Sequence, residues 1–346
     1  LSTKFAAGIG AFVRITQDML IKIAKDHVAK RIRREKDLVA VYLTGSVSEG
    51  EPLLGGSTDI DLIFVHKEEP PLKREVLRVT YEISLDIEHH HQSFYTYHRR
   101  LRQNPRIGFA LCNHQNILHD KDHWLEFIQA SVSARFDSPE NVYGRAQQFG
   151  ENARTLWFDL DDPQEVAWED WIALYFKAVG TAANAIACLN GPALTTRRFM
   201  LAFTSRAEAL ENLPLVGELT RLLGNQNMTE DLFAEWRPIW EKTLDAANDQ
   251  PDCPPNISKV RKAYFLQSVD AMSESGTLHA VLWPMIETWQ QALSCLENEK
   301  YHQNWHRFLE ELGFSPDRRD DLLTNLDHFI DQAERLLEDY KNSYNL

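Results

Sequence analysis

The sequence predicts two regions of different fold class. Residues 1–123 are expected to form an α/β domain of the α+β kind, with a small mixed sheet, and residues 124–346 an all-α helical domain. Three observations lead to this prediction. A chain of 346 residues has a length typical of about two domains. Short β-branched and aromatic runs alternate with helical patterns up to about residue 122. All nine tryptophans lie at or beyond Trp124, where helical periodicity takes over.

The first region alternates helix and strand. Apolar residues at helical spacing with basic residues between them predict its first helix, and runs that end at glycine or proline predict its strands. The expected elements, in order, are a helix over 15–36, a strand over 38–43, a glycine-rich loop, a strand over 60–65, a helix over 72–84, a strand over 85–89, a helix over 94–111 with a break at Pro105, and a short strand over 115–118.

The second region is expected to contain six to nine helices. Proline and glycine interrupt its helical patterns and predict where helices end. These breaks fall near Pro163, Gly191-Pro192, Gly224, Pro251 to Pro255, Gly276, and Gly313 to Pro316.

Charge is unevenly distributed along the chain. Residues 1–120 carry 17 basic and 15 acidic side chains, whereas the later residues carry 20 and 36, within a total of -14. An acidic second half makes DNA or RNA an unlikely partner, because nucleic-acid binding needs a basic surface. It suits a cationic small molecule or a basic protein surface, and it also serves solubility alone.

Cysteine usage and hydropathy indicate a cytoplasmic protein without a membrane segment. The four cysteines, Cys112, Cys188, Cys253 and Cys295, are far apart and lack zinc-ligand spacing, as expected for reduced core residues. The apolar stretch from Phe5 to Ile23 is interrupted by polar residues, so it predicts neither a membrane span nor a signal peptide.

The most informative segment joins two predicted strands. The first strand runs into Gly45-Ser46, where glycine allows close approach to a phosphate and serine offers a hydroxyl and an N–H group. Asp59 and Asp61 begin the second strand, and residues two apart in a strand share one face. Two carboxylates on one face are suited to Mg²⁺ or Mn²⁺, and a pair of such ions about 4 Å apart can clamp a triphosphate.

A third carboxylate is expected on the next strand. Leu85-Asp86-Ile87-Glu88 repeats the alternation of apolar and acidic residues. Asp86 would lie beside the first pair as general base, as a ligand of the second metal, or as both. Glu88 lies on the same face of the strand and is the second choice.

The combined pattern resembles the nucleotidyltransferase superfamily that includes DNA polymerase beta and the antibiotic nucleotidyltransferases. The resemblance covers roughly residues 25–122 and extends loosely to Asn116-Ile117-Leu118-His119-Asp120. This chain departs from the family pattern at Thr58, where serine is common, and in a long loop with Gly55-Gly56. The resemblance implies a small mixed sheet with the active site facing a helical domain.

By that resemblance, the chain would transfer a nucleoside monophosphate from an NTP, with ATP as first choice, to an acceptor hydroxyl and release pyrophosphate. Asp59, Asp61 and Asp86 would bind Mg²⁺ or Mn²⁺ and Gly45 and Ser46 the phosphate tail. A small cationic acceptor of the aminoglycoside type is the first expectation. The alternatives are a protein-modifying, AMPylating enzyme of the toxin–antitoxin type and a catalytically dead nucleotide-binding module.

Three other features have both a functional and a structural interpretation. His89-His90-His91 are adjacent in a strand, so they cannot share one metal ion well and are expected to mark the strand end. Arg197 or Arg198 could pair with phosphate or belong to a solvated helical turn. The acidic stretch 159–170 could attract a cationic acceptor or favour a helix N-terminus, and the Trp168-Trp171 pair is expected in the core.

Overall fold

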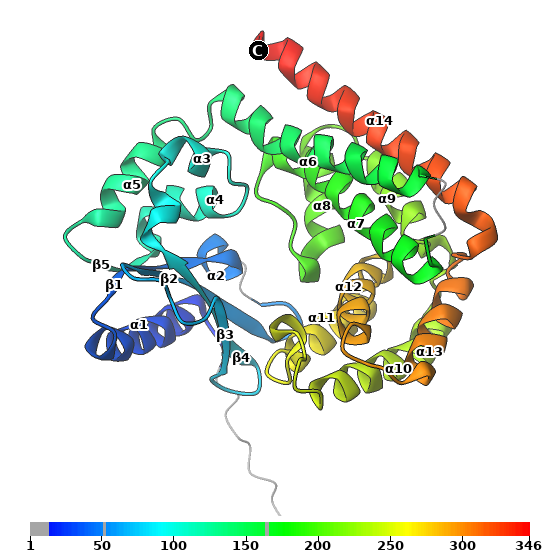
Figure 1. The fold of residues 1–346 in the computed structure, drawn as a ribbon, viewed down its shortest axis with the longest axis horizontal. Helices are drawn as coiled ribbons and strands as arrows, with labels where there is room; N and C mark the ends of the chain where they lie inside the picture. Colours follow the sequence, from blue (N-terminus) through cyan, green and yellow to red (C-terminus); the bar gives the residue numbers. More distant parts are fainter. Residues whose placement is uncertain (1–13, 51–52, 163–165) are drawn as a thin grey trace, which may run out of the picture.

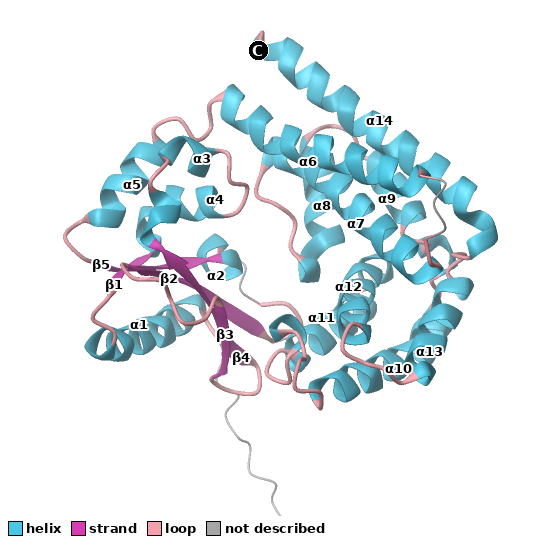
Figure 2. Cartoon of the chain, viewed as in Figure 1, coloured by secondary structure: helices cyan, strands magenta, loops and turns pink. Residues whose placement is uncertain are grey.

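The computed structural model describes residues 14–50, 53–162 and 166–346. Figure 1 shows a five-stranded sheet with its own helices on one side of the molecule and a larger helical region on the other. The two secondary-structure classes separate as clearly in Figure 2, where all the strands gather in one place. The predicted break at Pro163 and the residues before Arg14 of the predicted Phe5–Ile23 stretch lie outside the described residues.

The sheet has the order β3-β4-β2-β1-β5 and is mixed, as predicted. Only β2 and β4 run parallel among the pairs of described strands, and the other neighbours are antiparallel. The strands are β1 (Leu38–Thr44), β2 (Thr58–His66), β3 (Arg74–Arg78), β4 (Ile83–His91) and β5 (Ile117–Asp120).

One face of the sheet is covered by α1 (Gln17–Arg34). The apolar residues of α1 recur at helical spacing, so Leu20, Ala24 and Val28 are buried together. They pack on the alternate strand residues that include Ile60, Leu62, Phe64, Leu85 and Ile87. Because these residues take the α1 face, the acidic residues between them are directed to the opposite face.

The opposite face is only partly covered. α3 (His98–Arg102), α4 (Ile107–Cys112) and α5 (Trp124–Ser133) bury residues of this face that include Tyr42, Ile63 and Val65. The same core contains Leu125, Ile128, Val132 and Phe136, so the packing of the sheet continues past the domain boundary predicted at residue 123. The uncovered part of this face holds the acidic residues of β2 and β4.

Two local predictions in the first region are wrong. Residues 72–84, predicted as a helix, contain the edge strand β3, which pairs antiparallel with β4 from Arg74 opposite Glu88 to Arg78 opposite Ser84. Short mixed runs of this kind do not distinguish helix from strand by period alone, and the open edge of β4 decides the outcome. Residues 94–111, predicted as one broken helix, form the 3₁₀ turn Gln92–Tyr95 and the short helices α3 and α4.

The second region is helical, as predicted. Its residues from 124 onward that the structure describes form ten α-helices, one more than the predicted maximum. After α5 these are α6 (Pro139–Asp161), α7 (Trp168–Ala187), α8 (Phe199–Ala209), α9 (Pro214–Leu222), α10 (Glu230–Asn248), α11 (Lys262–Glu274), α12 (Leu282–Leu293), α13 (Glu299–Glu311) and α14 (Arg319–Tyr344). The predicted breaks from Gly191 to Pro316 all fall between helices.

The core of this region surrounds α7. Trp168–Asn190 is long and apolar enough to cross a membrane by composition, but 78% of its most apolar window is buried inside the molecule. Trp171, Tyr175 and Phe176 belong to the main core, and Trp168 stacks on Trp171 with ring centroids 5.5 Å apart. The Trp168-Trp171 pair is therefore part of the packing, as predicted. All four cysteines are free thiols.

Candidate metal centre

Three carboxylates meet on the part of the sheet that α3, α4 and α5 do not cover. The parallel register of β2 and β4 sets Asp61 beside Asp86, and Asp59 lies two residues earlier on the same face. One oxygen of each residue lies within 4.8 Å of the others. Asp59 and Asp86 are buried, and Asp61 is partly exposed. The predicted trio is thus brought together, and oxygen ligands at this spacing are suited to a divalent cation.

Gly45 lies directly against this cluster. It follows β1, whose last residue Thr44 pairs with Asp61, and it opens the short helix α2 (Gly45–Glu49) with φ +67°. A Cβ placed on Gly45 would stand 2.0 Å from Asp61 Oδ2, so only glycine allows this approach. The Ser46 hydroxyl is buried and has no hydrogen-bond partner among the described residues, which leaves it available to a ligand.

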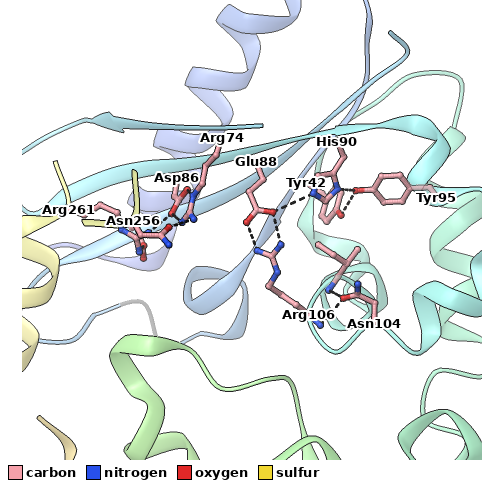
Figure 3. Close-up of polar contacts among 12 residues, drawn as sticks. Tyr42, Arg74, Asp86, Glu88, His90, Tyr95, Asn104, Arg106, Asn256 and Arg261 are labelled. Carbon is pink, nitrogen blue, oxygen red and sulfur yellow. Dashed lines mark hydrogen bonds and ion pairs between the residues drawn. The ribbon is translucent and has the colours of Figure 1, made fainter. Parts of the chain in front are cut away.

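Two arginines that the sequence reasoning missed are bound to the carboxylates. Arg261, which directly precedes α11, donates from Nη2 to Asp59 Oδ2 at 2.5 Å and from Nη1 to Asp86 Oδ2 at 2.8 Å. Arg74 of β3 donates from Nε to Asp86 Oδ1 at 2.7 Å and from Nη2 to Asp86 Oδ2 at 2.5 Å. Figure 3 shows both guanidinium groups approaching Asp86, Arg74 from the sheet and Arg261 from the helical region.

Asp59 Oδ1 and the Asp61 carboxylate are not bound by these arginines and favour a further positive charge. Burial, together with the charges of Asp59 and Asp86, raises the pKa of Asp61 well above its usual range, although Arg261 opposes this shift. Asp59 Oδ1 is buried without a hydrogen-bond partner among the described residues. Leaving such an oxygen unpaired is costly. A cation held by Asp59 Oδ1 and Asp61 would satisfy both groups, so the residues present fit a divalent metal.

Glu88, the second choice for the third carboxylate, is committed elsewhere. Arg106 donates from Nη1 and Nη2 to its two oxygens, each at 2.6 Å, and His90 Nε2 lies 3.4 Å away. These partners hold the pKa of Glu88 well below its usual range despite burial. Figure 3 shows Glu88 on the same strand as Asp86, with Arg106 reaching it from the segment before α4 and apart from the arginines at Asp86. Of the two candidates, Asp86 is therefore the one in the cluster.

The loop before β2 ties the centre to the helical region. Gly55 and Gly56 both have positive φ and close the tight turn between Leu54 and Ser57. A Cβ on Gly55 would stand 2.0 Å from the carbonyl oxygen of Gln267 in α11. Gly55 therefore allows the loop to pack on α11, whereas Gly56 supplies the second positive-φ position of the turn.

Arg197 and Arg198 support this loop and do not form a solvated turn. Arg197 is buried and donates from Nη1 to the Ser57 carbonyl at 3.0 Å, and Arg198 donates from Nη2 to the Leu53 carbonyl at 2.9 Å. Arg197 also lies over the Tyr264 ring, with 3.7 Å between Cζ and the ring centroid. Their predicted pairing with phosphate stays a prediction, whereas the contacts with the loop are present.

The three adjacent histidines diverge, as expected for a strand end. His89 points to the α1 face, where its Nδ1 lies 2.8 Å from His66 Nε2 and its Nε2 lies 3.0 Å from Glu75 Oε1. His90 points to the opposite face and contacts the Tyr95 hydroxyl at 2.8 Å. His91, the last residue of β4, contacts Ser93 Oγ and the Lys67 carbonyl. Their partners differ, so they do not form one metal site.

The acidic stretch 159–170 lies apart from the carboxylates. Its described residues end α6 and begin α7, with Glu169 and Asp170 in the first turn of α7. Figure 1 shows this turn on the side of the helical region away from the sheet. Acidic residues in a first turn stabilise a helix N-terminus, so the structural interpretation of the stretch accounts for its place.

The missed arginines had weak sequence signals. Arg74 could have been found if residues 74–78 had been recognised as a strand, because alternation would then direct Arg74 to the face of Glu88 and Asp86. Arg261 is 202 residues from Asp59 in the sequence, and no local pattern connects the two. No protein-family model matches the chain, and no curated protein is similar to it, so its structure and residues carry the functional argument.

Proposed function

We propose that the chain is a metal-dependent nucleotidyltransferase that moves a nucleoside monophosphate from an NTP to an acceptor hydroxyl. One observation carries the proposal: Asp59, Asp61 and Asp86 meet on one face of a mixed sheet, with Gly45 against Asp61. The order of strand, Gly-Ser, loop and Asp-x-Asp strand agrees with the superfamily that the sequence resembles. The helical region facing the carboxylates supports the same assignment.

In the proposed reaction, the acceptor oxygen forms a bond to the α-phosphorus while the bond to the bridging oxygen of pyrophosphate breaks. Asp59 and Asp61 hold the metal, which when bound neutralises phosphate charge and orients the triphosphate. Gly45 leaves room for the phosphate tail, and the unpartnered Ser46 hydroxyl donates to it. Arg261 and Arg74 add fixed positive charge beside Asp86.

The proton of the acceptor hydroxyl needs a carboxylate oxygen with a vacant position. Asp86 accepts three hydrogen bonds from Arg74 and Arg261, which occupy most of its roughly four acceptor positions. The carboxylate of Asp61 has neither a hydrogen bond nor an ion pair with any described residue, because Arg261 binds Asp59 and Asp86 instead. We therefore move the proton-accepting role, first expected of Asp86, to the free oxygen of Asp61.

The acceptor is proposed to bind on the β3–β4 side of the carboxylates. A hollow of about 570 Å³ lies there, lined by residues that include Arg74, Glu88, His90 and Phe94. Glu69 and Phe94 give its wall an acidic group and an apolar surface. Lys73 and Arg74 balance the acidic charge there, and Glu88 is paired with Arg106, so the hollow suits a small polar acceptor and its charge does not select a cation. The described residues of the acidic stretch 159–170 do not line this hollow, and Figure 1 shows the start of α7 on the side of the helical region away from the sheet.

The test is pyrophosphate release from each of the four NTPs with Mg²⁺ or Mn²⁺, in the presence of a panel of aminoglycosides. We expect release in the wild type and its loss in Asp59→Ala/Asp61→Ala, with Asp270→Ala as a control acidic residue of α11 that pairs with Arg237. Radiolabelled ATP in a lysate extends the test to protein acceptors, where labelled bands would identify the AMPylating alternative. Absence of both metal-dependent NTP binding and release in the wild type would overturn the proposal.

A second candidate function is nucleotide binding without turnover. It is favoured by the saturation of Asp86, whose oxygens are taken by two guanidinium groups. Metal-dependent binding of ATP with no pyrophosphate release from any NTP, across both acceptor screens, would select this candidate over the enzyme.

A further inference from the structure

We propose that Arg261 takes the place of a second divalent cation, so that the centre binds one metal ion and not two. The inference deepens the proposed function and rests on it. Arg74 and Arg261 bind the oxygens of the three carboxylates unequally. The charge of Asp86 is therefore already neutralised, whereas Asp59 Oδ1 and the Asp61 carboxylate still lack a positive partner.

The Asp86 side of the cluster is already neutralised. Arg74 binds both oxygens of Asp86, and Arg261 adds a bond to Oδ2 at 2.8 Å. Arg261 also bonds Asp59 Oδ2 at 2.5 Å, so its guanidinium bridges the first and third carboxylates. A divalent ion between Asp59 Oδ2 and Asp86 Oδ2 would have to occupy the space that this guanidinium fills. The position of a second metal is thus filled by a side chain that carries positive charge at every accessible pH.

The Asp61 side of the cluster is open. Asp59 Oδ1 faces no hydrogen-bond donor of the described residues although it is buried. The Asp61 carboxylate likewise has no hydrogen-bond or ion-pair partner in the described part of the chain, and the residue is partly exposed, so a solvated ion can reach it. These two groups are sufficient for one metal ion that completes its coordination with phosphate oxygens and water.

Charge balance supports a single ion. Three carboxylates and two guanidinium groups give the cluster a net formal charge of -1. One divalent ion brings that charge to +1, which a polyphosphate would offset. Two ions would bring it to +3 in a largely buried site, where excess charge of one sign is costly.

Arg261 is fixed in place and is not a mobile side chain. It is 7% exposed, and its Cζ lies 4.8 Å from the Tyr264 ring centroid and 5.5 Å from that of Phe265. The Tyr264 ring also contacts Arg197, whose Cζ lies 3.7 Å from the ring centroid. Tyr264 is therefore held in place by a second arginine.

The backbone that carries Arg261 is tied to β3. Arg78 Nη2 donates to the Lys259 carbonyl at 2.7 Å, and Arg74 Nη1 donates to Asn256. These contacts hold the segment before α11 against β3, so the Arg261 guanidinium is a resident cation of the centre.

The test counts Mn²⁺ ions bound by the full chain, using calorimetric titration and the electron paramagnetic resonance signal of free Mn²⁺. The double variant Asp59→Asn/Asp61→Asn measures binding elsewhere on the acidic surface, and that number is subtracted. We expect one ion at the centre of the wild type, two in Arg261→Ala, and one in Arg261→Lys, which restores a cation. Arg237→Ala, which removes an arginine paired with Asp270 and Glu241 of the helical region, should keep the count at one.

Two ions, or none, at the centre of the wild type would overturn the inference, and this outcome does not depend on how any Arg261 variant folds. A count of one in a folded Arg261→Ala, judged by circular dichroism, would overturn it as well. The proposed function fails separately. One bound Mn²⁺ with no pyrophosphate release from any NTP would refute the proposed transferase and support the single metal ion. Pyrophosphate release with two bound ions would support the transferase and refute the single metal ion.

Discussion

Asp61 Oδ2 lies 2.0 Å from the point at which a Cβ on Gly45 would stand. This contact between the end of β1 and the start of β2 sets how far the Asp61 carboxylate can project from the sheet. Gly45 also has φ +67°, a backbone conformation that residues with a Cβ adopt at a cost. The glycine therefore has two separable functions, one in the backbone and one in the position of Asp61.

Gly45→Ala is expected to weaken Mn²⁺ binding by at least about tenfold, because the new methyl group displaces the Asp61 carboxylate, and a lost ligand contact worth about 1.4 kcal/mol is tenfold in affinity. Gly50→Ala is the matched control, since Gly50 has φ +86° and nothing within 4 Å of its Cβ position. Both variants should lose about 1–2 kcal/mol of unfolding free energy from backbone strain, measured in urea. Equal Mn²⁺ affinity in the two variants would contradict the role given to Gly45.

The Gly55-Gly56 turn offers a second matched pair. Both residues have positive φ, but a Cβ on Gly55 would meet the Gln267 carbonyl at 2.0 Å, whereas a Cβ on Gly56 meets nothing within 4 Å. Gly56→Ala should cost only the backbone strain of about 1–2 kcal/mol. Gly55→Ala should cost about 2 kcal/mol more and expose the loop to limited proteolysis, because it separates the loop from α11. Similar urea curves for both variants would show that the loop does not depend on this contact.

Asp59 and Asp61, the proposed metal ligands, should respond oppositely in stability when each is replaced by asparagine. Burial and two neighbouring carboxylates raise the pKa of Asp61, so at pH 7 its charge destabilises the folded state. Asp61→Asn should remove Mn²⁺ binding yet raise the free energy of unfolding by up to about 1 kcal/mol. Asp59→Asn should remove binding and lower that free energy by on the order of 3 kcal/mol, because it leaves part of the Arg261 charge unpaired. Urea unfolding at pH 7 without metal measures the free energy of unfolding of both variants. A lower free energy of unfolding in Asp61→Asn than in the wild type would contradict the expected stabilisation.

A histidine network beneath the sheet predicts acid sensitivity. Burial lowers the pKa of His89 from 6.5, and the neighbouring His66 and Arg31 act in the same direction, although Glu75 opposes them. A histidine whose folded-state pKa is depressed takes up a proton first in the unfolded chain. The free energy of unfolding should therefore fall as the pH drops below about 6.5, and level off only below the folded-state pKa of His89.

His89→Gln should reduce this fall, measured by urea unfolding between pH 8 and pH 5. The groups facing His89 are His66 and Glu75, with Asp37 bound to His66 and Arg31 bound to Glu75. His123→Gln is the control variant. The hydrogen bond to Glu126 raises the pKa of His123, so protonation of His123 stabilises the folded state as the pH falls, opposite to His89. An unchanged pH profile in His89→Gln would place the acid sensitivity elsewhere.

Local patterns were sufficient to predict most of the sheet and the acidic cluster. Leu38–Thr44 is a continuous apolar run that ends at Gly45, which is typical of a buried strand. Thr58–His66 begins with acidic and apolar residues in alternation, and this alternation placed Asp59 and Asp61 together on one face. Asp86 followed from the same alternation in β4. Glycine and proline predicted the helix ends, because their backbone restrictions act locally.

The remainder depended on contacts that no local pattern contains. β3 forms because β4 offers an open edge, and its own residues fit helix and strand alike. Arg261 reaches Asp59 only when α11 packs against the loop at Gly55, which brings together residues 202 positions apart. The prediction of Arg197 as a phosphate ligand or a solvated residue missed its burial for the same reason, because its partner Ser57 belongs to the other region.

The bridge that Arg261 forms between Asp59 and Asp86 also orders the assembly of the molecule. Pairing of β2 with β4 gathers three like charges on one surface, and Arg74 alone offsets only part of them. The second positive charge beside the carboxylates comes from Arg261, which follows Asp86 by 175 positions in the sequence. During synthesis, the sheet therefore carries excess negative charge until the segment before α11 emerges. Pairing of Arg261 with Asp59 and Asp86 then favours docking of the two regions, in addition to apolar burial.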